Sequence, residues 1–164
     1  MAAARHNVGP SVARGHDKVR PSKRTNQIEL LPFSILSISN VSEDHRSLRE
    51  ILRHSGWRIA EVRTCKAALS RLSQRLLPVV ICESNLPDGN WRDVLLRIQT
   101  LAAPPAFIVS SRLADDQLWA EVLNLGGYDV LAKPFSESEV KYMVCTIRMR
   151  EQRPATQAVC ATTV

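Results

Sequence analysis

The 164-residue sequence lacks the features that mark membrane, secreted and zinc-binding proteins. No apolar run reaches the roughly 18 residues of a membrane-spanning helix, and the first residues contain no hydrophobic secretory signal. Its four cysteines are scattered without a CxxC pair, which favours free thiols over a zinc site. We therefore expect a cytoplasmic protein with no membrane association and no structural metal.

The sequence also lacks the signs of a small enzyme. It has no glycine-rich loop of the kind that cradles phosphate groups. Of its four histidines, His6 and His16 lie near the N-terminus, and His45 and His54 lie in a segment with helical periodicity. None is placed to act as a base for a nucleophile at the end of a strand, so we expect no enzymatic activity.

Residues 1–26 carry most of the net charge of +6. They contain six basic residues and one acidic residue, a net charge of +5, whereas the rest of the chain has 16 basic and 15 acidic residues. A basic segment with few apolar side chains cannot offset its ordering entropy by burial, so we expect residues 1–30 to be disordered. Such a segment is either a solvated tail without a specific partner or a contact for nucleic acid or anionic lipid, through counterion release.

From residue 34 onward, short apolar runs alternate with segments of helical period about every 20–25 residues. The composition of the chain, 45% hydrophobic and 23% charged, suits one globular domain. The expected strands are 34–38, 57–62, 78–82, 106–110 and 128–131. Helical spacing of apolar residues is found within 48–52, 65–72, 94–101, 118–125 and 140–147. This alternation predicts an α/β fold, a (βα)5 three-layer sandwich around a parallel five-stranded sheet.

The expected strands differ in how apolar they are. Residues 79–82 and 107–109 are apolar without interruption, which predicts cover on both faces, whereas 57–62 is mixed and suits an edge of the sheet. Right-handed crossovers place helices on both faces and gather any site at the C-terminal ends of the strands. The residues expected at those ends are Ser39, Asn40, Glu83, Ser110, Ser111 and Lys133.

Three motifs at these strand ends resemble those of one known family. The sequence ESNLPDG (83–89) follows the third expected strand, Ser110-Ser111 follows the fourth, and KPF (133–135) follows the fifth. In order and spacing they are similar to the receiver domain of two-component response regulators, the CheY-like superfamily, over residues 34–150. The resemblance implies a flavodoxin-like sheet of strand order 2-1-3-4-5 and leaves residues 151–164 as a flexible C-terminal segment.

The resemblance also implies a phosphoacceptor site, from which this chain departs. In the family, two adjacent acidic residues after the first strand hold Mg²⁺, and an aspartate at the end of the third strand accepts a phosphoryl group. The corresponding residues here are the uncharged Ser39 and Asn40, and Glu83. The family's hydroxyl and lysine correspond to Ser110 and Lys133. Because Mg²⁺ prefers negatively charged oxygen ligands, we expect no cofactor, no functional Mg²⁺ site and no phosphorylation by acetyl phosphate.

Two questions about this site stay open at the level of the sequence. Glu43 and Asp44 are candidate replacements for the acidic pair, but both fall in the first turn of an expected helix, where the helix dipole accounts for them without a metal. Glu83 is one methylene longer than aspartate. It either occupies the volume of a phosphoaspartate and locks the receiver through Lys133, or forms a purely structural ion pair with that lysine.

The signalling route implied by the family is altered as well. The aromatic switch residue, three positions before the lysine, is replaced by Val130, and Tyr128 is a candidate substitute on the same side of the strand. Residues 151–164 are too few for an output domain, so we expect action by protein contact, with a histidine kinase, another regulator or a second copy of the chain. The face that the family uses contains the fourth helix, the fifth strand and the fifth helix, and here Trp119, Leu123 and Val130.

The leading hypothesis is a single-domain, degenerate receiver that acts as an adaptor or modulator in a phosphorelay signalling system. One alternative is a receiver that accepts phosphate on an unconventional residue, such as Ser39, Ser84 or Asp88. A second alternative is a nucleic-acid-associated protein that acts through residues 1–30.

Overall fold

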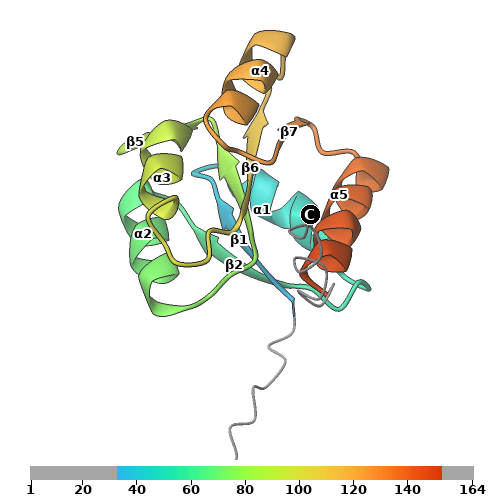
Figure 1. The fold of residues 1–164 in the computed structure, drawn as a ribbon. Coiled ribbons are helices and arrows are strands. Elements are labelled where there is room, and N and C mark those ends of the chain that lie inside the picture. Colours follow the sequence, from blue (N-terminus) through green and yellow to red (C-terminus); the bar gives the residue numbers. More distant parts are fainter. Residues whose placement is uncertain (1–32, 153–164) are drawn as a thin grey trace, which may run out of the picture.

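The computed structural model describes residues 33–152 and arranges them in a three-layer α/β sandwich (Figure 1). The predicted disordered segment 1–30, and all but the first two residues of the predicted flexible segment 151–164, lie outside the described residues. Within residues 33–152, no helix is long and apolar enough to cross a membrane.

Five parallel strands form the central sheet, in the order β2-β1-β3-β6-β7. Their bounds are β1 Ser34–Ile38, β2 Arg58–Val62, β3 Val79–Glu83, β6 Ala106–Ser111 and β7 Asp129–Ala132. Numbered along the chain, these five strands are ordered 2-1-3-4-5, which confirms the predicted fold class and topology. The mixed strand β2 lies at an edge of the sheet, as its pattern predicted.

Helices of the described region cover both faces of this sheet (Figure 1). One face carries α1 Ser42–Leu52 and α5 Glu137–Glu151, and the other carries α2 Cys65–Gln74, α3 Trp91–Ile98 and α4 Asp116–Asn124. Because each helix returns antiparallel to the strand before it, the helices begin at the end of the sheet where the strands finish. That end therefore gathers strand C-termini and helix N-termini.

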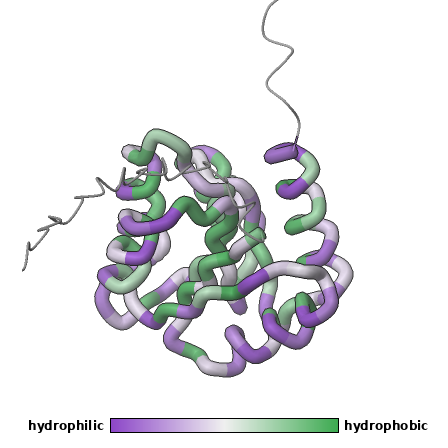
Figure 2. Tube along the Cα trace, turned by 90° about the horizontal axis from the view of Figure 1, so that it is seen from below, coloured by the Kyte–Doolittle hydropathy of each residue, from purple (hydrophilic) through white to green (hydrophobic). Residues whose placement is uncertain are grey.

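The strands direct alternate side chains into two apolar cores. Leu36 and Val80 pack toward α2 and α3, where the Trp91 ring is also buried, whereas Ile35 and Val79 pack toward α1 and α5. Figure 2 shows the hydrophobic segments gathered in the middle of the molecule and the hydrophilic ones around it. Burial on both faces makes the sheet a rigid platform for the residues at its C-terminal edge.

A small hairpin after β3 was not predicted from the sequence. Its strands are β4 Asn85–Leu86 and β5 Gly89–Asn90, on either side of a Pro87-Asp88 turn. It leads directly into α3, whose N-terminus has a capping box: Asn90 Oδ1 accepts from the backbone N–H of Arg92 at 2.8 Å, and Asp93 accepts from the N–H of Asn90 at 2.8 Å. Two-residue strands give no periodic signal, so only the turn itself was visible in the sequence.

Candidate functional site

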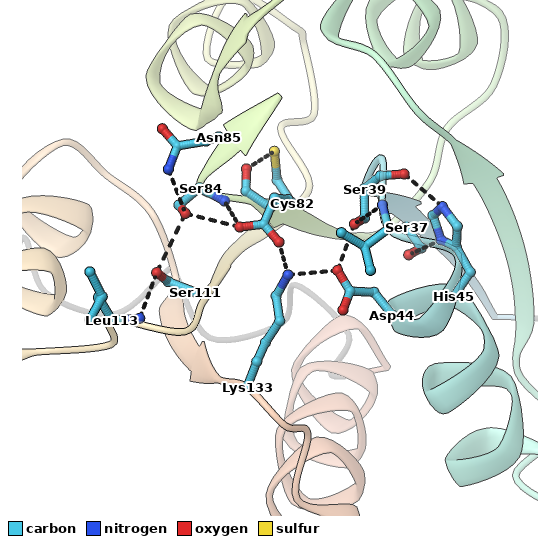
Figure 3. Close-up of polar contacts among 12 residues, drawn as sticks. Ser37, Ser39, Asp44, His45, Cys82, Ser84, Asn85, Ser111, Leu113 and Lys133 are labelled. Atoms are coloured by element: carbon cyan, nitrogen blue, oxygen red, sulfur yellow. Dashed lines mark hydrogen bonds and ion pairs between the residues drawn. The ribbon is translucent and has the colours of Figure 1, made fainter. Parts of the chain in front are cut away.

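A lysine between two carboxylates occupies the C-terminal edge of the sheet (Figure 3). Lys133 follows β7, Glu83 ends β3, and Asp44 lies in the first turn of α1. The Lys133 ammonium forms an ion pair with Glu83 and a second one with Asp44, with Nζ 2.6 Å from Asp44 Oδ2. The three side chains are 6%, 12% and 10% exposed, respectively. One ammonium group is therefore shared by two nearly buried carboxylates. With all three groups charged, the cluster of Lys133, Glu83 and Asp44 has a net charge of −1.

Hydroxyl and amide donors add further hydrogen bonds to both carboxylates. The Ser39 hydroxyl donates to Asp44 Oδ2 at 2.6 Å, and Ser39 Oγ in turn accepts from the backbone N–H of Val41. Glu83 Oε1 accepts from both the backbone N–H and the hydroxyl of Ser84, each at 3.0 Å. Buried carboxylates are costly unless they are paired in this way, so the network holds Glu83 and Asp44 in fixed positions.

The two serines at the end of β6 have different parts in this network. Ser110 is paired with Glu83 in the sheet register, and its carbonyl oxygen accepts from the backbone N–H of Ser84 at 2.9 Å. The hydroxyl of Ser111 lies 3.4 Å from that of Ser84 and accepts from the N–H of Leu113 at 3.1 Å. The sequence analysis assigned Ser110 to the hydroxyl position, whereas the hydroxyl that contacts Ser84 is that of Ser111. Two adjacent serines give no sequence signal that separates these two roles.

His45 fixes α1 against β1 directly behind Asp44. It is 3% exposed, and its Nε2 donates to the carbonyl oxygen of Ser39 at 2.9 Å. In the neutral ring, Nδ1 is then the acceptor for the Ser37 hydroxyl at 2.8 Å. Sequence reasoning placed His45 on a helix but missed this role; the signal for it was the polar Ser37 within an otherwise apolar strand.

Glu43 and Asp44 both lie in the first turn of α1, as the sequence predicted, but they have different surroundings. Glu43 is exposed and pairs with Arg46 one turn along the helix. Asp44 instead points into the molecule and binds Lys133. The reason is helical geometry, because successive residues differ by about 100° in direction and only Asp44 faces the sheet.

The residues of this site do not suit the Mg²⁺ ion that the fold family implies. Ser39 is 2% exposed and already donates to Asp44, and Asn40 is exposed and uncharged. Glu83 and Asp44 both direct an oxygen toward the Lys133 ammonium, which repels a second cation. Across residues 33–152, no group of three or more histidine, cysteine or acidic side chains is placed to hold a metal ion.

The mouth of the site is a cavity of about 290 Å³. It is lined by Glu43, Asp44, Ser47, Arg112, Lys133, Pro134 and Phe135. The charged side chains that line it are two carboxylates and two cations, so the cavity does not favour an anion such as phosphate.

Asp88, one of the unconventional acceptor candidates, is bound elsewhere. From the β4–β5 turn, its carboxylate accepts the backbone N–H groups of Cys65 at 2.7 Å and Lys66 at 3.0 Å, at the N-terminus of α2. These backbone hydrogen bonds hold the pKa of Asp88 below its ordinary value. The pKa of the neighbouring Cys65 thiol is raised to about 11, mainly because the thiol is buried, so it is protonated at neutral pH.

Replacing Asp88 with alanine is expected to lower the melting temperature by about 4 °C at pH 7, because α2 loses the acceptor for two N–H groups. A lowered folded-state pKa means that the carboxylate stabilises the fold above its unfolded pKa of about 3.9, and that this contribution is lost as the pH falls through the folded value. Thermal unfolding of both proteins between neutral and strongly acidic pH should show the difference shrinking.

The matched control is Asp116→Ala, which removes an exposed first-turn carboxylate from α4. Its effect should be smaller, since only the helix dipole is involved. If Asp88→Ala lowered the melting temperature by the same amount across the pH range, the role of the Asp88 carboxylate as the acceptor at α2 would be contradicted.

The sequence analysis placed Tyr128 on the same side of the strand as Val130, and this prediction is wrong. Val130 is 8% exposed and belongs to the core under α2 and α3, whereas Tyr128 packs against the core under α1 and α5. Tyr128 precedes β7, so the alternation of the strand does not extend to it. The guanidinium of Arg150 stacks on its ring, 5.5 Å from the centroid. Tyr128 is therefore not placed as a substitute for an aromatic residue at position 130.

Comparison with known proteins gives consistent matches over this domain. A family model described as the response regulator receiver domain matches residues 35–145. The chain is 27% identical over 108 residues to the KDP operon transcriptional regulatory protein KdpE of Escherichia coli K12, covering 66% of this chain and 48% of KdpE. It is 30% identical over 116 residues to the probable transcriptional regulatory protein y4xI of Sinorhizobium fredii, covering 70% of this chain and 49% of y4xI. The chain thus spans about half the length of these relatives.

The same likeness is found among solved structures. A two-component response regulator from Clostridium difficile superposes with a TM-score of 0.67 at 22% sequence identity, covering 73% of this chain and 98% of that one. At this identity the likeness concerns the fold.

Proposed function

Because the chain belongs to the response regulator receiver domain family, we propose that it is a receiver whose pocket is held by fixed ion pairs instead of by phosphorylation, and that it signals through protein contact. The observation that carries this proposal is the pairing of Lys133 with both Glu83 and Asp44. In this proposal the protein acts in the cytoplasm as an adaptor or modulator of two-component signalling, without enzymatic activity.

The ion pairs argue against phosphoryl transfer at position 83. Transfer to a carboxylate needs cations that neutralise the phosphoryl oxygens and a carboxylate oxygen free to attack. Glu83 Oε2 pairs with Lys133, and Glu83 Oε1 accepts two hydrogen bonds from Ser84. The lysine in turn is shared with Asp44. Glu83 in this arrangement keeps Lys133 in one position, in the way that a phosphorylated residue would.

The other acceptor candidates are also engaged. Ser39 and Ser84 donate their hydroxyl protons to Asp44 and Glu83, and Asp88 caps α2. We therefore expect no covalent modification when the full chain is incubated with acetyl phosphate and millimolar Mg²⁺ and its intact mass is measured. A phosphorylatable receiver treated in parallel serves as the positive control. An added phosphoryl group on Ser39, Ser84, Asp88 or Glu83 would overturn the proposal and favour an active receiver.

A partner surface is available on α4, β7 and α5. Trp119 on α4 is 49% exposed, and Tyr142 and Met149 on α5 are 76% and 70% exposed. The Trp119 indole N–H donates to Asp129 Oδ1 at the start of β7, at 3.0 Å, which holds the ring in place on the surface. A fixed, half-exposed tryptophan is typical of an interface anchor. Val130, which the sequence assigned to this face, is buried beneath it.

We propose that this face binds a histidine kinase, another regulator or a second copy of the chain. Leu123 at 36% exposure continues the apolar surface from Trp119. The surface is formed by two helices and a strand that are anchored in the two cores, so it is ready to bind without rearrangement.

A further inference from the structure

Helix α4 is the least buried helix of the described region. Of its own residues, all of which the structure describes, only Val122 is buried, whereas α1, α3 and α5 each bury four residues. Leu118 adds a half-buried side chain that packs against the core. In Figure 1, α4 extends beyond the end of the sheet at the top of the view. Apolar burial therefore holds α4 less firmly than it holds the other helices.

Polar side chains of α3 provide a second attachment for α4. Arg92 donates from Nε to Glu121 Oε1 and from Nη2 to Glu121 Oε2, so its guanidinium binds the carboxylate with two parallel hydrogen bonds. About two turns further along, at the C-cap of α3, the side-chain amide of Gln99 donates to the carbonyl oxygen of Leu125, the C-cap of α4. Helix α3 thus holds α4 both near its middle and at its end.

Arg92 itself is held in a fixed position. Its guanidinium lies over the Trp91 ring, 4.7 Å from the centroid, and Trp91 is 1% exposed. The backbone N–H of Trp91 donates to the carbonyl oxygen of Ser84 at 3.3 Å, directly after Glu83. The Arg92 side chain therefore reaches α4 from a rigid base beside the Lys133 site.

The contact between Arg92 and Glu121 matters more for α4 than its exposure suggests. The two side chains are 43% and 34% exposed, and such a pair adds little to a helix that is already well packed. Helix α4, however, has one buried residue, and the aromatic residue that the family places at position 130, on the adjacent strand, is a valine here. We therefore attribute the position of α4 largely to α3.

We propose that Arg92 positions the partner surface by clamping α4 to α3 through Glu121, and that α4 detaches locally from the sheet when this clamp is broken. Trp119 and Leu123 belong to one surface with β7 and α5 only while α4 is docked. The consequence for a partner rests on the proposed function: affinity falls in proportion to the fraction of molecules in which α4 is docked. The clamp itself is a property of the isolated chain.

Amide hydrogen exchange of the full chain, followed by NMR, tests this proposal without a partner. In the unaltered chain the amides of α4 should exchange faster than those of α3 and α5. Arg92→Met keeps the length of the side chain and its cover over Trp91 but removes the charge. It should speed exchange in α4 about fivefold, with a change of less than about twofold in α3 and α5. The indole N–H of Trp119 should exchange faster as well.

Two further variants show whether the ion pair is the cause. Glu121→Gln should act as Arg92→Met does, and the double variant should add little to either, because both substitutions remove the same pair. The matched control, Arg49→Met, breaks the similarly exposed pair between Arg49 on α1 and Glu61 on β2. Since α1 buries four residues, its exchange should stay within about twofold of that in the unaltered chain.

Unchanged exchange in α4 of Arg92→Met, or equal acceleration in α3, α4 and α5, would overturn the proposal. Additive effects of Arg92→Met and Glu121→Gln would do the same, as would an acceleration of α1 in the control that matches that of α4. Phosphorylation of the unaltered chain would refute the proposed function and leave the exchange result standing, so the two failures are distinguishable.

Discussion

Replacement of Lys133 by methionine is expected to destabilise the fold by about 3–5 kcal/mol. Methionine keeps the length of the side chain and removes its charge, which leaves Glu83 and Asp44 without their shared cation. Both carboxylates are about nine-tenths buried, so water cannot replace the ammonium at full strength. Urea unfolding followed by circular dichroism measures the free energy of unfolding directly.

Two further variants make this result specific to the cluster. Lys141→Met removes an exposed cation paired with Glu137 and should change the free energy of unfolding by less than about 0.5 kcal/mol. The triple variant Lys133→Met, Asp44→Asn, Glu83→Gln removes all three charges and should recover most of the lost stability, because no buried ion is left unpaired. Equal destabilisation by Lys133→Met and by the triple variant would mean that packing, and not charge, is what Lys133 contributes.

Restoring the family's acidic residues is expected to give the pocket saturable Mg²⁺ binding in the millimolar range. The required variant is Ser39→Asp, Asn40→Asp, Glu83→Asp combined with Asp44→Ala. The fourth change is needed because Ser39 Oγ lies 2.6 Å from Asp44 Oδ2, so a carboxylate at position 39 would meet that of Asp44. Removing Asp44 also releases Lys133 from one of its two ion pairs.

Isothermal titration calorimetry with Mg²⁺, followed by intact-mass measurement after treatment with acetyl phosphate, tests this conversion. The quadruple variant should acquire one phosphoryl group, since a free carboxylate and a metal would then be present together. The matched control keeps Asp44 and carries the other three substitutions, and it should bind Mg²⁺ more weakly because Lys133 stays bound to Asp44. Tighter binding by this control than by the quadruple variant would argue that Asp44 is itself a metal ligand.

The fold was predictable because its signals are repeated along the chain. Five apolar runs alternate with five segments of helical period, and a shift of one residue at a boundary does not disturb that order. The edge position of β2 followed from Arg58 and Glu61 within an otherwise apolar strand. The β4–β5 hairpin was missed because two-residue strands have no period to detect.

The contacts of the site were harder to predict because they depend on the direction in which each side chain points, which its position along the chain does not determine. Glu83 and Lys133 were found because Glu83 ends β3 and Lys133 follows β7, which places both at the C-terminal edge of the sheet. Asp44 lies on a helix, and whether it faced solvent or the sheet depended on the exact start of α1, which sequence patterns place only to within a residue or two. The helix dipole favours an acidic residue in the first turn whichever way its side chain points. It therefore could not distinguish Asp44 from Glu43.

We propose that the ion pairs of Lys133 with Glu83 and Asp44 hold the pocket without a divalent cation. The most direct measurement is a Mg²⁺ titration of the unaltered chain, followed through the backbone amide chemical shifts of Asn40, Ser84 and Ser111. We predict no saturable shift at millimolar Mg²⁺, with or without beryllofluoride. Saturable shifts confined to these residues would show that a metal enters the pocket and would contradict the account.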